Sequence, residues 1–261
     1  MKIALSIAYD GSKFYGWQKQ KTLPSIQEKI EYALSKVANE PIKTSCAGRT
    51  DAGTHATSQI VHFITNNKLP IQAWTLGVNS HLPKNININW AKQVENDFHA
   101  RFSAISRRYR YIIYNNPIRT SILNNGITHY KKKLNIKNMN FATKYLIGKK
   151  NLSSFKPSKC TSKNPKRNIY FIKIKCINQY IIVDIKANSF FHHMVRNIIG
   201  SLIEIGKEKK TKYWIHQLIK YKNRKLAGPT APSKGLYLVE INYPKKFKLP
   251  KIPIGPLFLI N

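Results

Sequence analysis

The chain of 261 residues carries 45 Lys and Arg against 11 Asp and Glu, a formal net charge of +34, and 42% of its residues are hydrophobic. That length suffices for one large hydrophobic core or two modest ones. The charge favours a polyanionic partner, with nucleic acid first, although a genome biased toward lysine would produce a similar excess.

Cysteine usage and the N-terminal segment both predict a cytoplasmic protein. Cys46, Cys160 and Cys176 are widely spaced, which argues against a disulfide framework and against a zinc site. Asp10 interrupts the first apolar run before a secretory core forms, and no later run approaches membrane-spanning length. We therefore expect no membrane association.

The first half of the chain alternates predicted strands and helices. An apolar strand at 2–9 is followed by a turn-like stretch, DGSKFYGWQKQ. Ser25 and Glu28 have the spacing of a capping box, and the residues after them place their apolar side chains on one helical face. A second helix is predicted near 70–79, and strands are predicted near 42–48, 58–65, 86–94 and 106–114.

The second half of the chain also alternates predicted strands and helices. Periodicity predicts helices near 137–147, 190–205 and 212–221, and strands near 169–176, 180–187 and 235–242, with Gly206 as a helix stop. We place a domain boundary near residue 105, which gives an N-terminal lobe, 1–105, and a C-terminal lobe, 106–261. The segment 156–167, KPSKCTSKNPKR, reads as an exposed basic loop, either merely solvated or in contact with phosphate.

The segment CAGRTDAGTHA, residues 46–56, is the strongest candidate for chemistry. Only nine of the 45 basic residues are Arg, and Arg offers a planar fork that pairs with carboxylates and phosphates. If a strand continued through this segment, Arg49 and Asp51 would point to the same face and form an ion pair. A guanidinium nearby would keep the carboxylate ionised beneath a base, whereas the alternative is a surface ion pair that caps a turn.

GRTDAGTHA resembles the signature of the tRNA pseudouridine synthase A family, in which this aspartate is the essential nucleophile. Thr54 stands where the family has valine, and since both are β-branched we expect little consequence. Further blocks match in the right order and cover nearly the whole chain: YDGSKFYGWQKQ (9–20), SIQEKIEYAL (25–34), FHARFSAISRRYRYIIYN (98–115), FFHHMVRNIIGSL (190–202) and GLYLVEINYP (235–244).

The resemblance implies a fold and a reaction. The expected fold is α/β (α+β), with two similar lobes, each a mainly antiparallel sheet flanked by helices, and an active-site cleft between them. The expected reaction uses no metal and no cofactor: uracil leaves the ribose, rotates and is rejoined through C5. Asp51 would attack C1′, attack C6, or first promote loss of a ribose proton, and these routes stay open. The target base must also leave its stack, which calls for an aromatic platform.

The resemblance also implies residue roles. Tyr109 would stack on the target uracil, although a strand tyrosine is ordinarily core. Arg196, on an otherwise apolar helix, would pair with Asp51, and Leu236 would line the uracil pocket. Arg49 would occupy the space left by the flipped base. Further RNA contacts are implied in two segments: Phe98, His99, Ala100, Arg101 and Phe102, and Lys159, Cys160, Thr161, Ser162 and Lys163.

The implied partners are tRNA and a second copy of the chain. A homodimer would bind one tRNA across both subunits and modify uridines 38, 39 and 40 of the anticodon arm. Two other classes of function make different predictions. For a non-catalytic RNA-binding module, Asp51→Ala would change nothing. For a metal-dependent nuclease, a chelator would reduce the activity. Asp occurs only at 10, 51, 97 and 184, which shows no carboxylate cluster of the kind that a two-metal nuclease uses.

Overall fold

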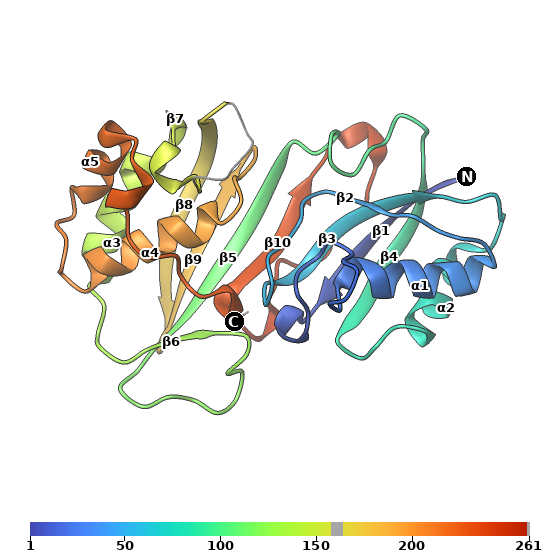
Figure 1. Cartoon of the computed structure of the whole chain (residues 1–261), viewed down its shortest axis with the longest axis horizontal. Helices are drawn as coiled ribbons and strands as arrows, with labels where there is room; N and C mark the ends of the chain where they lie inside the picture. The colour runs from blue at the N-terminus through green and yellow to red at the C-terminus, as the bar shows by residue number, and fades with distance from the viewer. Residues whose placement is uncertain (158–163, 260–261) are drawn as a thin grey trace. The chain divides into compact units, whose positions relative to one another are not determined.

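A computed structural model describes residues 1–157 and 164–259 (Figure 1). The chain divides into two compact units, the first made of Met1–Ile105 together with the segment from Tyr237 onward, and the second of Ser106–Leu236. The sequence division assigned everything after 105 to one lobe. The difference arises because a C-terminal strand pairs with a strand of the first unit, and such pairing between distant segments leaves no local signal.

The first unit is built on a sheet in the order β4 (Ile86–Val94), β1 (Lys2–Tyr9), β3 (His55–Ile64) and β10 (Leu236–Asn242). Strand β1 is antiparallel to both of its neighbours, β10 is parallel to β3, and the short β2 (Ser45–Cys46) pairs with β3. Figure 1 shows α1 (Ile26–Ala38) and α2 (Leu76–Ser80) on one face of this sheet.

Helix α1 forms as its sequence predicts. The Ser25 side chain accepts a hydrogen bond from the Glu28 backbone N–H, and the Glu28 carboxylate accepts one from the Ser25 N–H, which completes the capping box. The helix ends at Asn39, whose backbone is left-handed with φ of 48°. Its buried residues lie on the face that covers the sheet: Ile26, Ile30, Ala33, Leu34 and Ala38.

In the second unit, neighbouring antiparallel strands follow in the order β5 (Ser106–Asn115), β9 (Tyr180–Ala187), β8 (Lys166–Ile177) and β7 (Gly148–Asn151). Strand β6 (Thr128–Tyr130) is parallel to β5. The helices of this unit are α3 (Ile136–Thr143), α4 (Met194–Gly206) and α5 (Trp214–Tyr221). The predicted class, α/β with mainly antiparallel sheets, is confirmed.

Several predicted boundaries shift. Strand β2 covers only Ser45–Cys46 of the expected 42–48, and the helix expected near 70–79 is a 3-10 turn, Ile71–Trp74, followed by α2. Helix α4 begins at Met194 rather than near 190, because His193 adopts a left-handed backbone with φ of 58°. Among the described residues, no helix has both the length and the apolar character needed to cross a membrane.

Candidate active site

The Asp51 loop, residues 47–54, joins β2 to β3 and carries the GRTDAG motif. Two bonds tie its start to β3: the Ala47 N–H donates to the Ile60 carbonyl (2.8 Å), and the Gln59 side-chain amide donates to the Gly48 carbonyl (2.6 Å). Asp51 itself is half-buried. Because no strand continues through the loop, the expected alternation of side chains does not set the relation of Arg49 to Asp51, and Arg49 is exposed.

The segment 9–17 holds this loop from the other side. Trp17 N–H donates to the Thr50 carbonyl (3.0 Å), Gly53 N–H donates to the Phe14 carbonyl (3.2 Å), and the hydroxyls of Tyr9 and Thr50 share a hydrogen bond (2.7 Å). The backbone on both sides of Asp51 is therefore fixed by a segment that lies about forty residues earlier in the chain. The YDGSKFYGWQ block therefore has a structural role, which is to hold the Asp51 loop in place.

Two glycines make that approach feasible. A Cβ on Gly11 would lie 2.0 Å from the Thr54 carbonyl oxygen, which is far closer than two such atoms can come. Gly16 has φ of +93°, a backbone that side-chain-bearing residues rarely adopt, and a Cβ there would lie 2.8 Å from the Thr50 carbonyl oxygen. Both positions therefore require glycine as long as the Asp51 loop keeps its place.

His55, at the start of β3, anchors the far end of the loop. Its Nδ1 lies 3.0 Å from the Asp10 carboxylate and 3.2 Å from the Gly11 backbone nitrogen. The ring of Tyr237 on β10 stacks on the imidazole with centroids 4.7 Å apart. The hydrogen bond from His55 holds the pKa of the Asp10 carboxyl well below its usual range, and partial burial opposes this only in part. The sequence analysis did not predict the contact between Asp10 and His55. The only sequence signal for it is that both residues lie in blocks that match the family, Asp10 in YDGSKFYGWQKQ and His55 in GRTDAGTHA.

Thr54, where the resemblance leads us to expect valine, is almost fully buried at 2% exposure. Its hydroxyl has no hydrogen-bond partner among the described residues. Burial of an unpaired hydroxyl costs free energy that a valine methyl group at the same place would not. The unpaired hydroxyl therefore predicts an effect on stability, which β-branching alone does not suggest.

The FHARF segment, 98–102, is a turn whose side chains divide into two groups. Phe98 and Ala100 are completely buried, and Phe98 packs edge-on against Phe247 with centroids 5.0 Å apart. Arg101 and Phe102 are exposed, with the guanidinium 5.6 Å from the phenyl centroid. Direct RNA contact through the side chains of Phe98 and Ala100 is therefore inconsistent with the fold, because both fill the core.

Two histidines hold the FHARF turn by accepting hydrogen bonds from its backbone. Nδ1 of His62 accepts from the Ala100 N–H (3.1 Å), and Nδ1 of His99 accepts from the N–H groups of Arg101 (3.1 Å) and Phe102 (3.2 Å). Burial, with His99 and Lys2 nearby, lowers the pKa of His62 to about 4. His62 is therefore neutral at pH 7 and able to act as an acceptor.

The remaining predicted residues belong to the second unit. Tyr109 on β5 is buried, with the Phe190 ring edge-on at 5.2 Å between centroids. On α4, Arg196 Nε donates to the Ala231 carbonyl (2.7 Å), so this charge has a backbone partner within its own unit. Leu236 opens β10 and is 5% exposed. The pairing of Arg196 with Asp51 stays a prediction, and the segment Lys159, Cys160, Thr161, Ser162 and Lys163 lies outside the described residues.

Two of the arginines near Tyr109 have a structural role. Arg108 donates to both carboxylate oxygens of Asp184 (2.7 and 2.6 Å), and Arg110 Nε donates to the same carboxylate (3.0 Å). Strand pairing sets this up, because Arg110 lies directly opposite Asp184 on β9. The sequence shows that three arginines lie within the ten residues of this strand. It does not show that Asp184, which is 74 residues away from Arg110, is the partner of Arg108 and Arg110.

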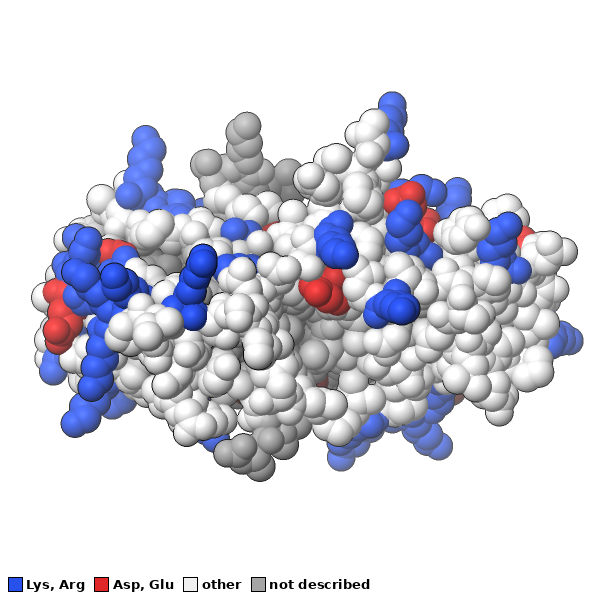
Figure 2. Space-filling model, turned by 90° about the horizontal axis from the view of Figure 1, so that it is seen from below, with Lys and Arg blue, Asp and Glu red and all other residues white. Residues whose placement is uncertain are grey.

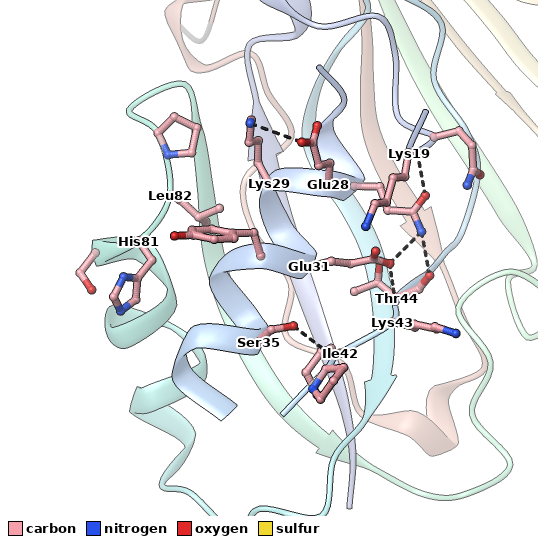
Figure 3. Close-up of a pocket in the computed structure, with 16 residues that line it drawn as sticks. Lys19, Glu28, Lys29, Glu31, Ser35, Ile42, Lys43, Thr44, His81 and Leu82 are labelled. Carbon is pink, nitrogen blue, oxygen red and sulfur yellow. Dashed lines mark hydrogen bonds and ion pairs between the residues drawn. The ribbon is translucent and has the colours of Figure 1, made fainter. Parts of the chain in front are cut away.

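A groove on the first unit lies apart from the Asp51 loop, between α1 and the segments 41–44 and 80–83 (Figure 3). Its polar floor is already satisfied: the Glu31 carboxylate accepts hydrogen bonds from the Thr44 N–H (2.8 Å), the Thr44 hydroxyl (3.1 Å) and the Gln27 amide (2.9 Å). At its rim Lys29 lies 3.7 Å from Glu28. None of the sequence-predicted site residues lines this groove.

Comparison with known proteins finds relatives that match the chain over its whole length. The family model described as tRNA pseudouridine synthase matches residues 5–103 and 142–244. The tRNA pseudouridine synthase A of Aliivibrio fischeri (strain MJ11) is 53% identical over 261 residues, covering 100% of both chains. That of Salmonella arizonae is 55% identical over 260 residues, covering 100% of this chain and 96% of the relative. Among solved structures, an archaeal box H/ACA sRNP Nop10-Cbf5 complex aligns with 86% of this chain and 59% of that chain at 9% identity and a TM-score of 0.36.

Proposed function

Since this chain belongs to the tRNA pseudouridine synthase family, we propose that it converts uridine to pseudouridine at positions 38, 39 and 40 of tRNA, with Asp51 as the nucleophile. The observation that carries the proposal is the Asp51 loop itself. It holds the family signature, and its backbone is fixed before and after Asp51 by hydrogen bonds to the segment 9–17. A carboxylate held this way is pre-organised for attack on a bound nucleotide.

The reaction rearranges the bonds within one nucleotide and makes two demands on the protein. The bond between uracil N1 and ribose C1′ breaks, a bond from C5 to C1′ forms, the hydrogen on C5 leaves as a proton, and N1 takes up a proton. No electrons are gained or lost overall, and product and substrate have the same composition. Asp51 must be ionised to form the transient covalent bond, whether that bond is to C1′ or to C6. A base is also needed to accept the C5 proton, within hydrogen-bond reach of that carbon.

The other residues take supporting roles in the proposal. Tyr109 stacks on the uracil, Leu236 supplies an apolar wall, and Arg196 keeps Asp51 ionised. Arg49, which is exposed beside Asp51 in the same loop, takes the place of the flipped base. The turn 98–102 contributes through Arg101 and Phe102, whose guanidinium and ring face solvent and suit a phosphate and a base respectively. A cytoplasmic homodimer is the assembly that we propose for it.

Tritium release from tRNA labelled at uridine C5 tests the reaction and the nucleophile together, because the new C5 bond expels that hydrogen. Wild type should release tritium without added metal, whereas Asp51→Asn and Asp51→Ala should release none above background and still bind tRNA. Full release by either variant would remove Asp51 from the mechanism. Binding without release by wild type would indicate a non-catalytic RNA-binding protein.

The modified positions are tested by transcripts in which uridines 38, 39 and 40 are replaced by cytidine one at a time and all together. The triple replacement should abolish tritium release, and each single replacement should remove only the label at its own position. Undiminished release from the triple transcript would place the activity elsewhere in tRNA. That result would leave the role of Asp51 intact, since the two experiments are independent.

A further inference from the structure

The second unit carries a group of aromatic rings and lysines at the C-terminal end of α3 and around the start of α5. We define this α3–α5 patch by six residues, Phe141, Lys144, Tyr145, Lys212, Tyr213 and His216. The four rings contact one another in sequence. Tyr213 and Phe141 are 5.4 Å apart between centroids, Phe141 and Tyr145 are 6.0 Å apart, and Tyr145 and His216 are stacked at 5.1 Å.

Two ammonium groups lie over the same ring in this patch. Lys212 Nζ is 4.7 Å and Lys144 Nζ is 5.3 Å from the Phe141 centroid. Beside them, Lys210 Nζ lies 5.3 Å from the centroid of Trp214. A ring face attracts an ammonium group but does not neutralise it. The aromatic surface thus positions the lysines while leaving their charge available to a second partner.

The surrounding sequence offers these lysines few carboxylates. Residues 136–150 include four lysines and no acidic residue, and residues 209–225 include six lysines, one arginine and no acidic residue. The nearby acidic side chains of α4 and its C-terminal end are engaged elsewhere: Glu204 pairs with Lys207 (2.6 Å), and Glu208 accepts from the Asn135 amide (2.8 Å). Figure 2, seen from below, shows basic side chains with a few acidic ones at the left, the end where Figure 1 places the second unit.

We propose that the α3–α5 patch is an RNA-binding surface that contacts the sugar-phosphate backbone of the substrate tRNA outside the Asp51 site. The inference rests on the proposed function insofar as tRNA is the substrate. Unneutralised lysines attract phosphate, and counterion release supplies the affinity. RNA is favoured over an acidic protein because Tyr213, 49% exposed, offers a ring on which an unpaired base can stack.

Paired charge-removal variants of the full-length protein test the proposal. Lys144→Gln with Lys212→Gln removes two lysines of the patch. The matched control, Lys29→Gln with Lys36→Gln, removes two lysines of α1, where Lys36 also lies over a ring, that of Tyr32 at 5.6 Å, but Glu28 and Glu31 share the helix. The probe is unmodified tRNA transcript, and the dissociation constant is measured from 50 to 200 mM KCl.

The patch variant should bind tRNA about tenfold more weakly at 100 mM salt, and its salt slope should fall by roughly 1.5 to 2, as expected for two lost phosphate contacts. The control should change by less than about twofold. Equal losses in both variants would mean general electrostatic attraction, and no loss in the patch variant would mean no contact; either overturns the proposal. A changed oligomeric state by light scattering would assign the patch to a second copy and overturn it as well.

Measuring the rate of C5 tritium release distinguishes a failure of this inference from a failure of the proposed function. At saturating tRNA the patch variant should release C5 tritium at the wild-type rate, since the patch contains none of the residues proposed for the reaction. If wild type bound tRNA through the patch and released no tritium, the proposed function would fail while the surface remained. If the tritium rate fell at saturation with affinity unchanged, the role of the patch in binding would be wrong.

Discussion

At the scale of single residues, Thr54 shows what one buried hydroxyl can cost. The side chain is 2% exposed, and its Oγ1 has no hydrogen-bond partner among the described residues. Thr54→Val should therefore raise the free energy of unfolding by about 1 kcal/mol, because it removes a buried unpaired polar group at nearly constant volume. Urea denaturation measures the change through the midpoint at constant slope.

Thr50 provides the matched control for that substitution. It is also buried in the Asp51 loop, at 8% exposure, but its hydroxyl is bonded to the Tyr9 hydroxyl at 2.7 Å. Thr50→Val should lower the free energy of unfolding by about 1 kcal/mol or more, since Tyr9 then loses a partner. If both variants moved stability in the same direction, hydrogen bonding would not be the cause of the difference.

His62 links a single protonation to the FHARF turn. Burial, with His99 and Lys2 nearby, lowers its pKa from 6.5 to about 4, and its Nδ1 accepts from the Ala100 N–H. A lowered folded pKa means that the unfolded chain takes up the proton first. The stabilisation from neutral His62 is therefore complete above about pH 6.5 and is lost as the pH falls toward 4.

We expect His62→Asn to remove part of this pH dependence. The free energy of unfolding of wild type should decline from pH 7 to pH 4 more steeply than that of the variant, so the gap between them narrows in acid. Urea titrations at each pH provide the measurement, and amide hydrogen exchange at Ala100 reports on the turn directly. A gap that is constant from pH 7 to pH 4 would show that His62 does not titrate differently in the folded state.

At the scale of elements, the close approach of the segment 9–17 to the Asp51 loop depends on Gly11. A methyl group there would lie 2.0 Å from the Thr54 carbonyl oxygen, so Gly11→Ala must displace one of the two segments. A displacement of about 1 Å at a catalytic group costs on the order of a hundredfold in rate. We predict that loss in the rate of C5 tritium release at saturating tRNA.

Gly48 is the control within the same loop, because a Cβ there would meet nothing within 4 Å. Gly48→Ala should keep the rate within a few-fold of wild type, with unchanged tRNA affinity. Comparable rate losses in the two variants would indicate that the loop tolerates no added side chain at all. The close contact between Gly11 and Thr54 would then not be the reason.

The same elements show what a sequence reveals about its fold. Helix α1 was predictable because the capping box and the apolar face are both local patterns. The strands β4, β5 and β9 were predictable because alternation and β-branched residues span only a few positions. The motif match singles out Asp51 for a different reason, since a signature carries chemical information that periodicity does not, and its role as nucleophile stays a prediction.

What the sequence could not supply is pairing over long separations. Asp10 meets His55 across 45 residues, Ala100 meets His62 across 38, and β10 returns to β3 from the end of the chain. The sequence also does not show which residues of the FHARF motif are buried. Phe98 and Ala100 fill the core, whereas Arg101 and Phe102 face solvent. A left-handed residue such as His193 carries no propensity signal and shortens the predicted helix.

At the scale of the whole molecule, the net charge of +34 predicts how tRNA affinity responds to salt. Each phosphate neutralised by Lys or Arg releases a counterion, which contributes a slope of roughly −0.9 on duplex and −0.7 on single strands to log K against log salt. With 45 basic residues against 11 acidic ones, several such contacts are expected on a substrate that has both kinds of region.

The dissociation constant for tRNA should therefore rise by about a hundredfold or more between 50 and 200 mM KCl, as for other proteins with several phosphate contacts. The rate of C5 tritium release at saturating tRNA should change far less, because salt screens exposed charges at long range and acts only weakly on groups enclosed around the base. Salt would then raise the apparent Michaelis constant and leave the turnover number nearly constant. Affinity that stayed flat over this range would mean that the excess lysine only decorates the surface, as a biased genome would produce. The polyanionic partner would then have to be argued from the motif alone.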